Sequence, residues 1–420
     1  MSARGAGGRS GAWTAPLVLL AFVACCQPAA RPGPTELVFW QSWPVEVVQP
    51  LIAKFEAETT GVHVRIERIA REDGPARVIA AVDSGKVPDL CELDAAAMPG
   101  FLGTGALADW SAGSADLRPS IRGWEMCSVG ETVYGIPWVL ETRMLLYDRA
   151  LFSRARLDPN RGPETWDELQ RAAAAIQKLG GGIHGFGICT AEGRGAFEQF
   201  MPLAWGNGGR ILSVSGDSAQ FDSPENRAAL AFYLGLRKVG ATGSQDALER
   251  EFKRGRLGML LAGPRLLEQL TEKSPGRSYG VTPVPRPATD RGGHASIAAG
   301  RVLVSFPDSK HKEAALRLAR FLVRPENVLV LAEADPGVLP ATVGADTAAC
   351  YRRDPGRQTM IRQLETARFR PGIANWSAME VAVDSALTRA LLDRKSPPES
   401  AVARASAQSE RAIAALLRKR

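Results

Sequence analysis

Residues 36–68 read ELVFWQSWPVEVVQPLIAKFEAETTGVHVRIER and contain, in order, a short apolar run, a helical pattern and an alternating pattern. Between 45 and 60 the apolar residues recur with the spacing of one helix face, and Gly61 is a natural stop for a helix. Residues 62–66 (VHVRI) then alternate between apolar and polar, as a half-buried strand does. This stretch therefore predicts a strand, a helix and a second strand.

The elements that follow repeat this order. A helix is expected over about 75–83, with Gly85 just after its end, and a short apolar strand over 89–93. Strands that alternate with helices form a parallel sheet with helices on both faces. Ligands of such sheets bind at the carboxyl ends of the strands, where residues 40–43 and 92–94 are expected to lie.

The composition is that of an ordinary globular protein. Of the 420 residues, 45% are hydrophobic and 23% are charged, which excludes a largely disordered chain. This length favours about two or three domains. The formal net charge is +7, but the basic residues are spread along the chain and form no dense run interleaved with aromatics. We therefore expect no nucleic-acid partner.

The N-terminus has the pattern of an export signal. Residues 1–24 contain no acidic residue, two arginines near the start and an apolar run over 12–24. This run is shorter than the ~20 apolar residues that a membrane-spanning helix needs. Residues 22–25 (FVAC) resemble the end of a bacterial lipoprotein signal. The sequence therefore predicts a lipoprotein signal peptide over 1–24.

The resemblance to lipoproteins implies that Cys25 carries the lipid and holds the protein at a membrane. Phe22 departs from the Leu that is usual in such signals, which leaves Cys26 as a second candidate. A plain cleaved signal followed by structural cysteines is the alternative. Residues 27–34 are rich in Pro and Ala, and we expect 25–35 to be a tether.

The remaining cysteines give no metal or redox motif. They lie far apart and without CxxC spacing, and the sequence leaves their possible disulfide pairing open: Cys91, Cys127, Cys189 and Cys350. The histidines show no ligand spacing either: His63, His184, His294 and His311. We expect neither a metal site nor a cofactor.

A series of short motifs runs along the rest of the chain. They are 39–43 (FWQSW), 85–90 (GKVPDL), 105–109 (GALAD), 134–138 (YGIPW), 145–152 (LLYDRALF), 165–169 (TWDEL), 205–209 (WGNGG), 252–259 (FKRGRLGM), 279–281 (YGV) and 337–340 (GVLP). In this order they resemble the extracellular solute-binding proteins of ABC importers, specifically the carbohydrate-binding, maltose-binding-like group. The resemblance covers about 36–402, nearly the whole chain after the signal.

The resemblance implies an α/β protein with the two-lobe periplasmic-binding-protein fold, type II-like, in which each lobe is a sheet flanked by helices and a hinge joins the lobes. Carried onto this chain, the N-terminal lobe holds 36–141 plus 283–335, and the C-terminal lobe holds 145–281 plus 339–420. The hinge is then expected near 141–144, 282 and 336–338. Closure of such lobes on a ligand is a population shift toward the closed state.

Sugars present apolar C–H faces and hydroxyl rims, so their sites combine aromatic surfaces with polar groups. The aromatic candidates are Trp40, Trp43, Trp138, Trp205 and Trp376. The polar candidates are Gln41, Asp94, Glu141, Asn207, Arg265, Gly300 and Arg301. Each has a structural alternative, namely core packing for the tryptophans and capping, turn or hinge contacts for the polar residues. Two positions depart from the family pattern: Arg265 replaces a usual Trp, and Ala299-Gly300-Arg301 replaces a Gly-Gly pair.

The resemblance implies a monomeric binding protein that gives a sugar or oligosaccharide to the permease subunits of an ABC importer. A receptor module for a sensor system and a binder of glycerol-phosphate-like solutes or polyamines are the alternatives. A glycosidase would need two carboxylates, such as Glu92 with Asp94 or Glu141. Nothing in the sequence fixes their separation, and it contains no HExxH, P-loop or GxSxG motif, so we expect no catalytic residue.

Overall fold

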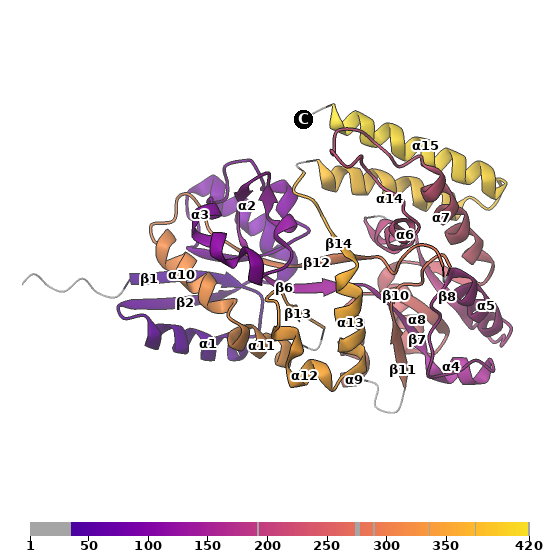
Figure 1. The fold of residues 1–420 in the computed structure, drawn as a ribbon, viewed down its shortest axis with the longest axis horizontal. Coiled ribbons are helices and arrows are strands. Elements are labelled where there is room, and N and C mark those ends of the chain that lie inside the picture. The colour runs from indigo at the N-terminus through magenta and orange to yellow at the C-terminus, as the bar shows by residue number, and fades with distance from the viewer. Residues whose placement is uncertain are drawn as a thin grey trace, which may run out of the picture. The chain divides into compact units, whose positions relative to one another are not determined.

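The computed structural model describes residues 35–190, 193–273, 278–288, 290–335, 337–373 and 375–418. Within these residues the chain forms two large sheets, each flanked by helices (Figure 1). The predicted signal peptide and nearly all of the tether, with Cys25 and Cys26, lie outside the described residues. No helix in the described part is long and apolar enough to cross a membrane.

The first sheet has the strand order β13-β6-β12-β3-β1-β2, and β14 pairs with β12. Its strands are β1 (Thr35–Gln41), β2 (Val62–Arg68), β3 (Leu90–Asp94), β6 (Ile136–Thr142), β12 (Ser296–Val304), β13 (Leu339–Pro340) and β14 (Ala367–Phe369). Strands β1, β2 and β3 are parallel, which confirms the strand–helix order predicted from residues 36–93. Strand β12 lies between β3 and β6 and is antiparallel to both. It therefore brings residues 296–304 next to strands from the first half of the chain.

The helices of this sheet form where the sequence predicts them. Helix α1 (Val45–Glu58) buries Val48, Leu51, Ile52 and Phe55 against the sheet. Helix α2 (Gly74–Ser84) ends at Gly85, whose φ of +66° is a left-handed conformation that glycine adopts without strain. The remaining elements around this sheet are α3 (Ser111–Ser114), β4 (Ser128–Val129), β5 (Thr132–Val133), α10 (Lys312–Leu322) and α11 (Pro325–Ala334).

The second sheet has the order β11-β7-β10-β8-β9. Its strands are β7 (Met144–Asp148), β8 (His184–Cys189), β9 (Gly240–Gly243), β10 (Leu257–Ala262) and β11 (Tyr279–Thr282). Its helices are α4 (Arg149–Arg154), α5 (Trp166–Gln177), α6 (Gly195–Gly206), α7 (Pro224–Gly235), α8 (Gln245–Lys253), α9 (Pro264–Lys273), α14 (Trp376–Leu392) and α15 (Pro398–Leu417). Thr165 caps α5 by accepting a hydrogen bond from the Glu168 N–H at 3.2 Å.

The two sheets are joined where β6 runs directly into β7. The Thr142 hydroxyl donates to the Ile297 carbonyl at 3.1 Å, and the Ser296 hydroxyl donates to the Arg143 carbonyl at 2.8 Å. Strand β13 pairs with β6 and β14 pairs with β12, so residues 339–340 and 367–369 lie in the first sheet and not in the C-terminal lobe, where we expected them. The reason is that the chain returns to the first sheet at β13, before it reaches α12 (Ala349–Arg352) and α13 (Pro355–Glu365), and again at β14, after α13. The other lobe and hinge boundaries stay predictions.

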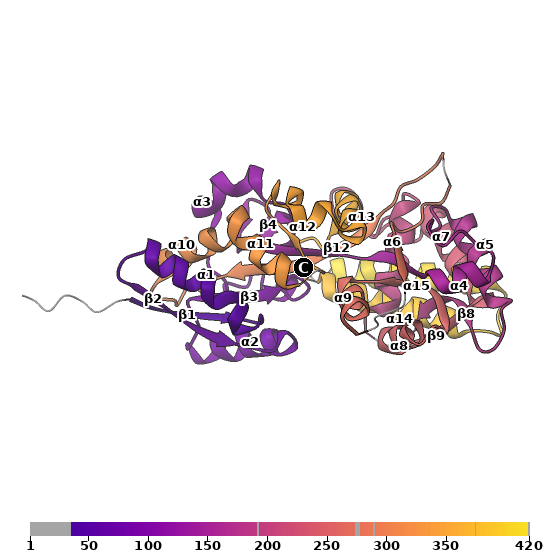
Figure 2. The same ribbon diagram turned by 90° about the horizontal axis from the view of Figure 1, so that it is seen from below.

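Helix α13 holds the segment that leads into β12. The buried Gln363 amide accepts from the Val284 N–H at 2.6 Å and donates to the His294 carbonyl at 2.8 Å. Figure 2 shows α13 beside β12, between the helices of the two sheets. The Gln363 side chain therefore holds Val284 and His294, the two ends of the loop that leads into β12.

We predict that Gln363→Leu lowers the free energy of unfolding by about 2–4 kcal/mol, because the Val284 N–H is then buried without an acceptor. The His294 carbonyl keeps the Thr366 hydroxyl as a donor. Urea denaturation measures the change. Glu365→Ala, an exposed position on the same helix, is the control and should change stability by less than about 0.5 kcal/mol. Equal effects of the two substitutions would contradict the role given to Gln363.

Candidate functional site

A pocket of about 640 Å³ lies between α2 and α14. One wall comes from the region around α2 and the end of β3 and contains Arg71, Glu72, Pro75, Asp94, Ala96 and Ala97. The other wall comes from the start of α6 and from α14 and contains Gly193, Arg194, Ser377 and Val381. We call this pocket the cleft. Its walls come from elements packed on different sheets, and its volume suits a small molecule.

Six charged residues form the first ion-pair network beside the cleft: Arg71, Arg301, Glu92, Asp94, Glu141 and Asp335. Arg71 lies 2.7 Å from Asp94 and 3.0 Å from Glu141. Arg301, whose side chain is only 9% exposed, lies 3.4 Å from Glu92 and 3.5 Å from Glu141. Four carboxylates thus surround two guanidinium groups, so this wall is rich in hydrogen-bond acceptors.

Two members of this network are fixed further by local contacts. Glu92 accepts from the Ser42 N–H at 2.7 Å and from the Ser42 hydroxyl at 3.0 Å. Asp94 accepts from the Ala96 N–H at 2.9 Å, which sets the turn after β3. Burial raises the pKa of Asp335, and the Gly337 N–H and Arg301 only partly offset this effect. These contacts hold the carboxylates in place before any ligand arrives.

The tryptophans of the first sheet are buried, not exposed in the cleft as we expected of sugar platforms. Trp40 is 8% exposed, Trp43 is 4% exposed and Trp138 is completely buried. The Arg77 guanidinium lies 4.8 Å from the ring centre of Trp40, and that of Arg301 lies 4.4 Å from Trp43. Each of these two rings therefore has a guanidinium group over one face. Whether either ring contacts a ligand stays a prediction.

A small cavity of about 20 Å³ lies next to the cleft and shares Arg71 and Asp94 with it. Gln41 lines this cavity, is 1% exposed, and has no hydrogen-bond partner for either amide atom. A cavity of this size holds one water molecule. Because an unpaired buried amide is costly, we expect a water molecule or a ligand hydroxyl to complete its hydrogen bonds.

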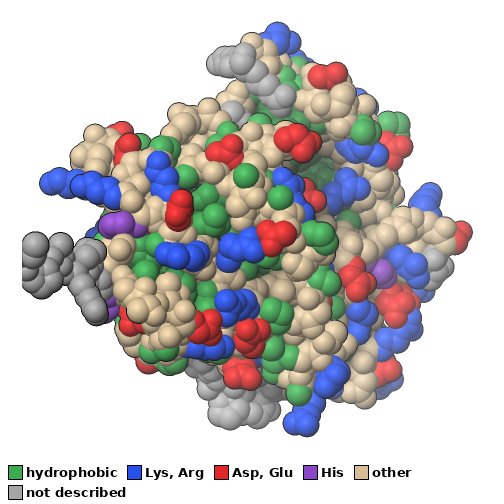
Figure 3. Space-filling model, turned by 60° about the vertical axis from the view of Figure 1, so that its left-hand side comes forward, with side chains coloured by type: hydrophobic (Ala, Val, Ile, Leu, Met, Phe, Trp, Pro, Cys, Tyr) green, Lys and Arg blue, Asp and Glu red, His purple; other side chains and the backbone are tan. Residues whose placement is uncertain are grey.

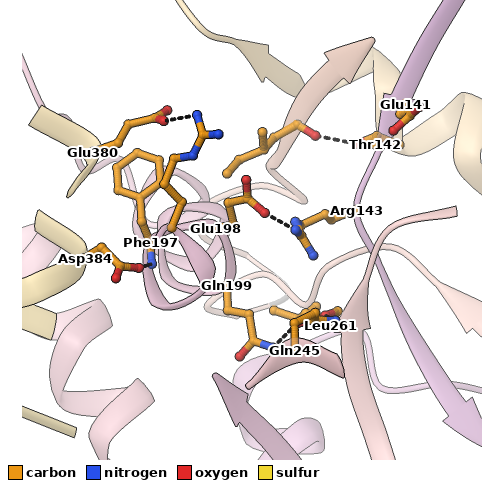
Figure 4. Close-up of polar contacts among 12 residues, drawn as sticks. Glu141, Thr142, Arg143, Phe197, Glu198, Gln199, Gln245, Leu261, Glu380 and Asp384 are labelled. Carbon is orange, nitrogen blue, oxygen red and sulfur yellow. Dashed lines mark hydrogen bonds and ion pairs between the residues drawn. The ribbon is translucent and has the colours of Figure 1, made fainter. Parts of the chain in front are cut away.

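The second ion-pair network lies on the opposite side of the cleft and contains Arg143, Arg194, Arg370, Glu198 and Glu380. Glu198 pairs with Arg143 and lies 2.9 Å from Arg370, as the close-up in Figure 4 shows for the Arg143 contact. The completely buried Glu380 lies 2.7 Å from Arg370 and 3.4 Å from Arg194. Although burial opposes it, the positive charges of Arg143 and Arg370 lower the pKa of Glu198 to about 2.

Trp376 belongs to this second network. Its indole N–H donates to Glu380 at 2.8 Å, and its side chain is buried at the start of α14. Trp205 is also buried, with the Arg368 guanidinium 5.6 Å from its ring centre. Both rings therefore have structural contacts in this conformation, and their predicted ligand contacts stay predictions.

Four of the predicted polar candidates line neither pocket: Glu141, which belongs to the first network, and Asn207, Arg265 and Gly300. Asn207 donates to the Glu225 carbonyl at 2.8 Å and stabilises a turn. Arg265 is exposed and lies 3.1 Å from Asp246, away from the residues that line the cleft. Gly300 lies where a Cβ atom would come within 2.2 Å of the Val139 carbonyl, so close strand packing accounts for this glycine. By contrast Gln41, Asp94, Glu141 and Arg301 come together at the first network.

Several residues that line the cleft are not among the candidates predicted from the sequence, namely Arg71, Glu72, Arg194, Ser377 and Val381. Arg71 and Glu72 follow β2, and Arg194 follows β8, so the rule that ligands bind at the carboxyl ends of strands would have found them. Cys91, Cys127, Cys189 and Cys350 form no disulfide with one another. Among the described residues no group of His, Cys, Asp and Glu could hold a metal ion.

Comparison with known proteins identifies the family. Residues 50–359 match the family model of the bacterial extracellular solute-binding proteins. The chain belongs to this family. It is 27% identical over 384 residues to a lipoprotein encoded near oleD in Streptomyces antibioticus, covering 85% of this chain and 82% of that protein. It is 24% identical over 400 residues to the sn-glycerol-3-phosphate-binding periplasmic protein UgpB of Escherichia coli, covering 87% and 90%.

Solved structures of sugar-binding proteins share the fold. The cyclic α-maltosyl-1,6-maltose-binding protein of Arthrobacter globiformis matches with a TM-score of 0.81 and 24% identity, over 92% of this chain and 100% of that one. The sugar-binding protein MalE of Xanthomonas citri matches with a TM-score of 0.78 and 25% identity, over 91% and 98%. The two-lobe fold expected from the sequence is therefore confirmed.

The second network leads to a prediction about pH. The pKa of Glu198 is about 2 in the folded protein and near 4.5 in the unfolded chain. The ionised Glu198 therefore makes its full contribution to the free energy of unfolding above about pH 4.5, and this contribution is lost as the pH falls toward 2. We predict that Glu198→Gln lowers the free energy of unfolding by about 1–3 kcal/mol at neutral pH, and that the difference from the unmodified protein narrows below about pH 4.5.

Urea denaturation over a pH series measures this narrowing. The control is Asp167→Asn, which removes an exposed ion pair with Arg171 and should change stability by less than about 1 kcal/mol. A difference between Glu198→Gln and the unmodified protein that stayed constant down to about pH 2 would contradict the assignment.

Proposed function

We propose that this protein is the substrate-binding protein of an ABC importer, which captures a sugar or oligosaccharide in the cleft and delivers it to a membrane permease. The observation that carries the proposal is the pocket of about 640 Å³, with charged and small side chains converging from elements of both sheets. The family assignment and the similarity to the sugar-binding protein of Xanthomonas citri support it. The protein acts as a binding protein and not as an enzyme.

The charges beside the cleft favour a neutral polyhydroxy ligand over a phosphate ester. The first network has four carboxylates and two guanidinium groups, and carboxylates accept hydrogen bonds from hydroxyl groups but repel phosphate. The three arginines of the second network are each within ion-pair distance of Glu198 or Glu380. A glycerol-phosphate ligand, suggested by the relationship to UgpB, is the second candidate.

The same proposal covers export and anchoring. The signal-like residues 1–24 and the similarity to a Streptomyces lipoprotein support a protein that is exported and held outside the cytoplasmic membrane through a lipid on Cys25. We propose that it acts as a monomer. Figure 3 shows basic and acidic side chains interspersed over one face of the molecule, without a continuous basic area on that face.

A thermal-shift screen tests the ligand class, because a ligand that binds only the folded protein raises its melting temperature. We predict that a maltose-type oligosaccharide or a monosaccharide such as tagatose raises the melting temperature and that glycerol 3-phosphate does not. A shift with glycerol 3-phosphate alone would favour the second candidate. No shift with any sugar or polyol would contradict the proposal.

We predict that Asp94→Asn weakens binding of the sugar found in that screen by about tenfold or more, because a charged acceptor in the cleft is lost. The amide oxygen still accepts from the Ala96 N–H, so the melting temperature without ligand should change little. Titration calorimetry measures the affinity. Asp246→Asn, exposed and outside the cleft, is the matched control and should bind normally. Normal binding by Asp94→Asn would exclude this carboxylate from the site.

We predict that Cys25→Ala abolishes incorporation of labelled fatty acid and releases the protein into the soluble fraction. The reason is that Cys25 is the expected site of the lipid anchor. Cys26→Ala is the control and should remain lipidated. If Cys25→Ala still takes up label and Cys26→Ala does not, the lipid site is Cys26.

A further inference from the structure

A second pocket, of about 570 Å³, lies away from the cleft and shares no lining residue with it. Its walls are formed by β7, β11, the start of α4 and α9 on one side and by α12 and α13 on the other. In Figure 1, α9 and α12 lie below the crossing strands β6 and β12, whereas α2 and α14 lie above them. The second pocket and the cleft are therefore on opposite sides of the crossing strands.

Three guanidinium groups line this pocket, from Arg149, Arg352 and Arg362. None of them has a carboxylate partner among the described residues, whereas the arginines beside the cleft are all paired. The Arg149 guanidinium donates to the neutral Asn160 side chain at 3.1 Å, and among the described residues its buried Nε–H has no acceptor. Arg362 donates to the neutral Thr359 hydroxyl at 3.0 Å. Three positive charges thus line the pocket without an ion-pair partner in the part of the chain that the structure describes.

The one carboxylate that lines the pocket is directed elsewhere. Asp354 caps α13 by accepting from the Gly356 N–H at 2.8 Å and the Arg357 N–H at 3.2 Å. Its other oxygen lies 3.8 Å from the Arg357 guanidinium, which is outside the lining of the pocket. Asp354 is therefore held by its own helix, and its charge offsets one of the three positive charges that line the pocket. The hydroxyl-bearing Tyr147 and the amide of Gln358 add polar groups to the wall.

We propose that this pocket binds a small, soluble anion with two or more negative charges, carried on phosphate or carboxylate groups. Guanidinium groups donate forked hydrogen bonds that match both kinds of group. A volume of about 570 Å³ accommodates such an ion with several protein groups around it. The proposal concerns a site separate from the cleft, so it does not depend on which solute the cleft takes.

Because of the position of the pocket, an anion bound in it is expected to affect the closure of the two lobes. Helix α12 is attached to the side of the first sheet, because the Tyr351 hydroxyl donates to the Val338 carbonyl at 3.1 Å. Helix α13 contacts both sides: Arg357 donates to the Ala332 carbonyl at 2.8 Å, and the helix also packs against β11 of the second sheet. Tyr147 and Arg149 belong to the second sheet and the helix that follows it. An anion that contacts both walls favours one relative position of the two sheets, a coupling that rests on the hinge proposed above.

Titration calorimetry with pyrophosphate and, separately, with citrate tests the site at physiological ionic strength. We expect saturable binding of at least one of these probes at one site per chain, weakened about tenfold or more by Arg149→Ala and by Arg352→Ala. The control is Arg353→Ala, an exposed neighbour that does not line the pocket, which should bind as the unmodified protein does. Whichever probe binds identifies phosphate or carboxylate as the preferred group.

Two results would overturn the site: no saturable binding of either probe, or an equal loss of affinity in Arg353→Ala, which would indicate a general effect of surface charge. Small-angle scattering tests the coupling on the same samples. A radius of gyration that changes on saturation with the bound probe in the unmodified protein, but not in Arg149→Ala, supports it. If the protein binds the probe but its radius of gyration does not change, the proposed coupling to lobe closure is wrong. The proposed anion site would still stand.

Discussion

The contact of Arg301 with Trp43 and the surrounding carboxylates organises the first network and the small cavity next to the cleft. Arg301 lies on β12, and its guanidinium is placed between the indole ring of Trp43, 4.4 Å away, and the carboxylates of Glu92 and Glu141. A buried guanidinium is tolerated only when its charge and hydrogen bonds are compensated, and these groups provide that compensation. The position of β12 between β3 and β6 brings all of these residues together.

This arrangement changes what the tryptophans do. With Arg301 over Trp43 and Arg77 over Trp40, the rings contribute to the core of the first sheet, where Trp138 packs against both Phe39 and Trp43 with ring centres 6.2 Å apart. The cleft is lined by charged side chains, such as Arg71 and Asp94, together with apolar ones, such as Pro75 and Val381. Neither Trp40 nor Trp43 is among its lining residues.

Local patterns in the sequence were sufficient for much of the fold. The apolar spacing of α1 and the glycine after α2 each depend on residues within a few positions, and each occurs as predicted. The burial of Trp43 could not be predicted in the same way, because it depends on Arg301, which reaches it only through the pairing of β12 with β3. Strand β13 was misplaced for the same reason, since its partner β6 is remote in sequence.

The two networks differ in a way that bears on how the lobes respond to a ligand. In the second network every carboxylate is shared between at least two guanidinium groups, and Glu380 also accepts the indole N–H of Trp376. Groups with several partners lose more than one interaction when they move, so this side of the cleft is expected to act as a rigid unit. The first network places Arg71, which is partly exposed, at the edge facing Arg194 across the cleft. Adjustment to different solutes is therefore expected at Arg71, while the residues around Glu380 keep their positions.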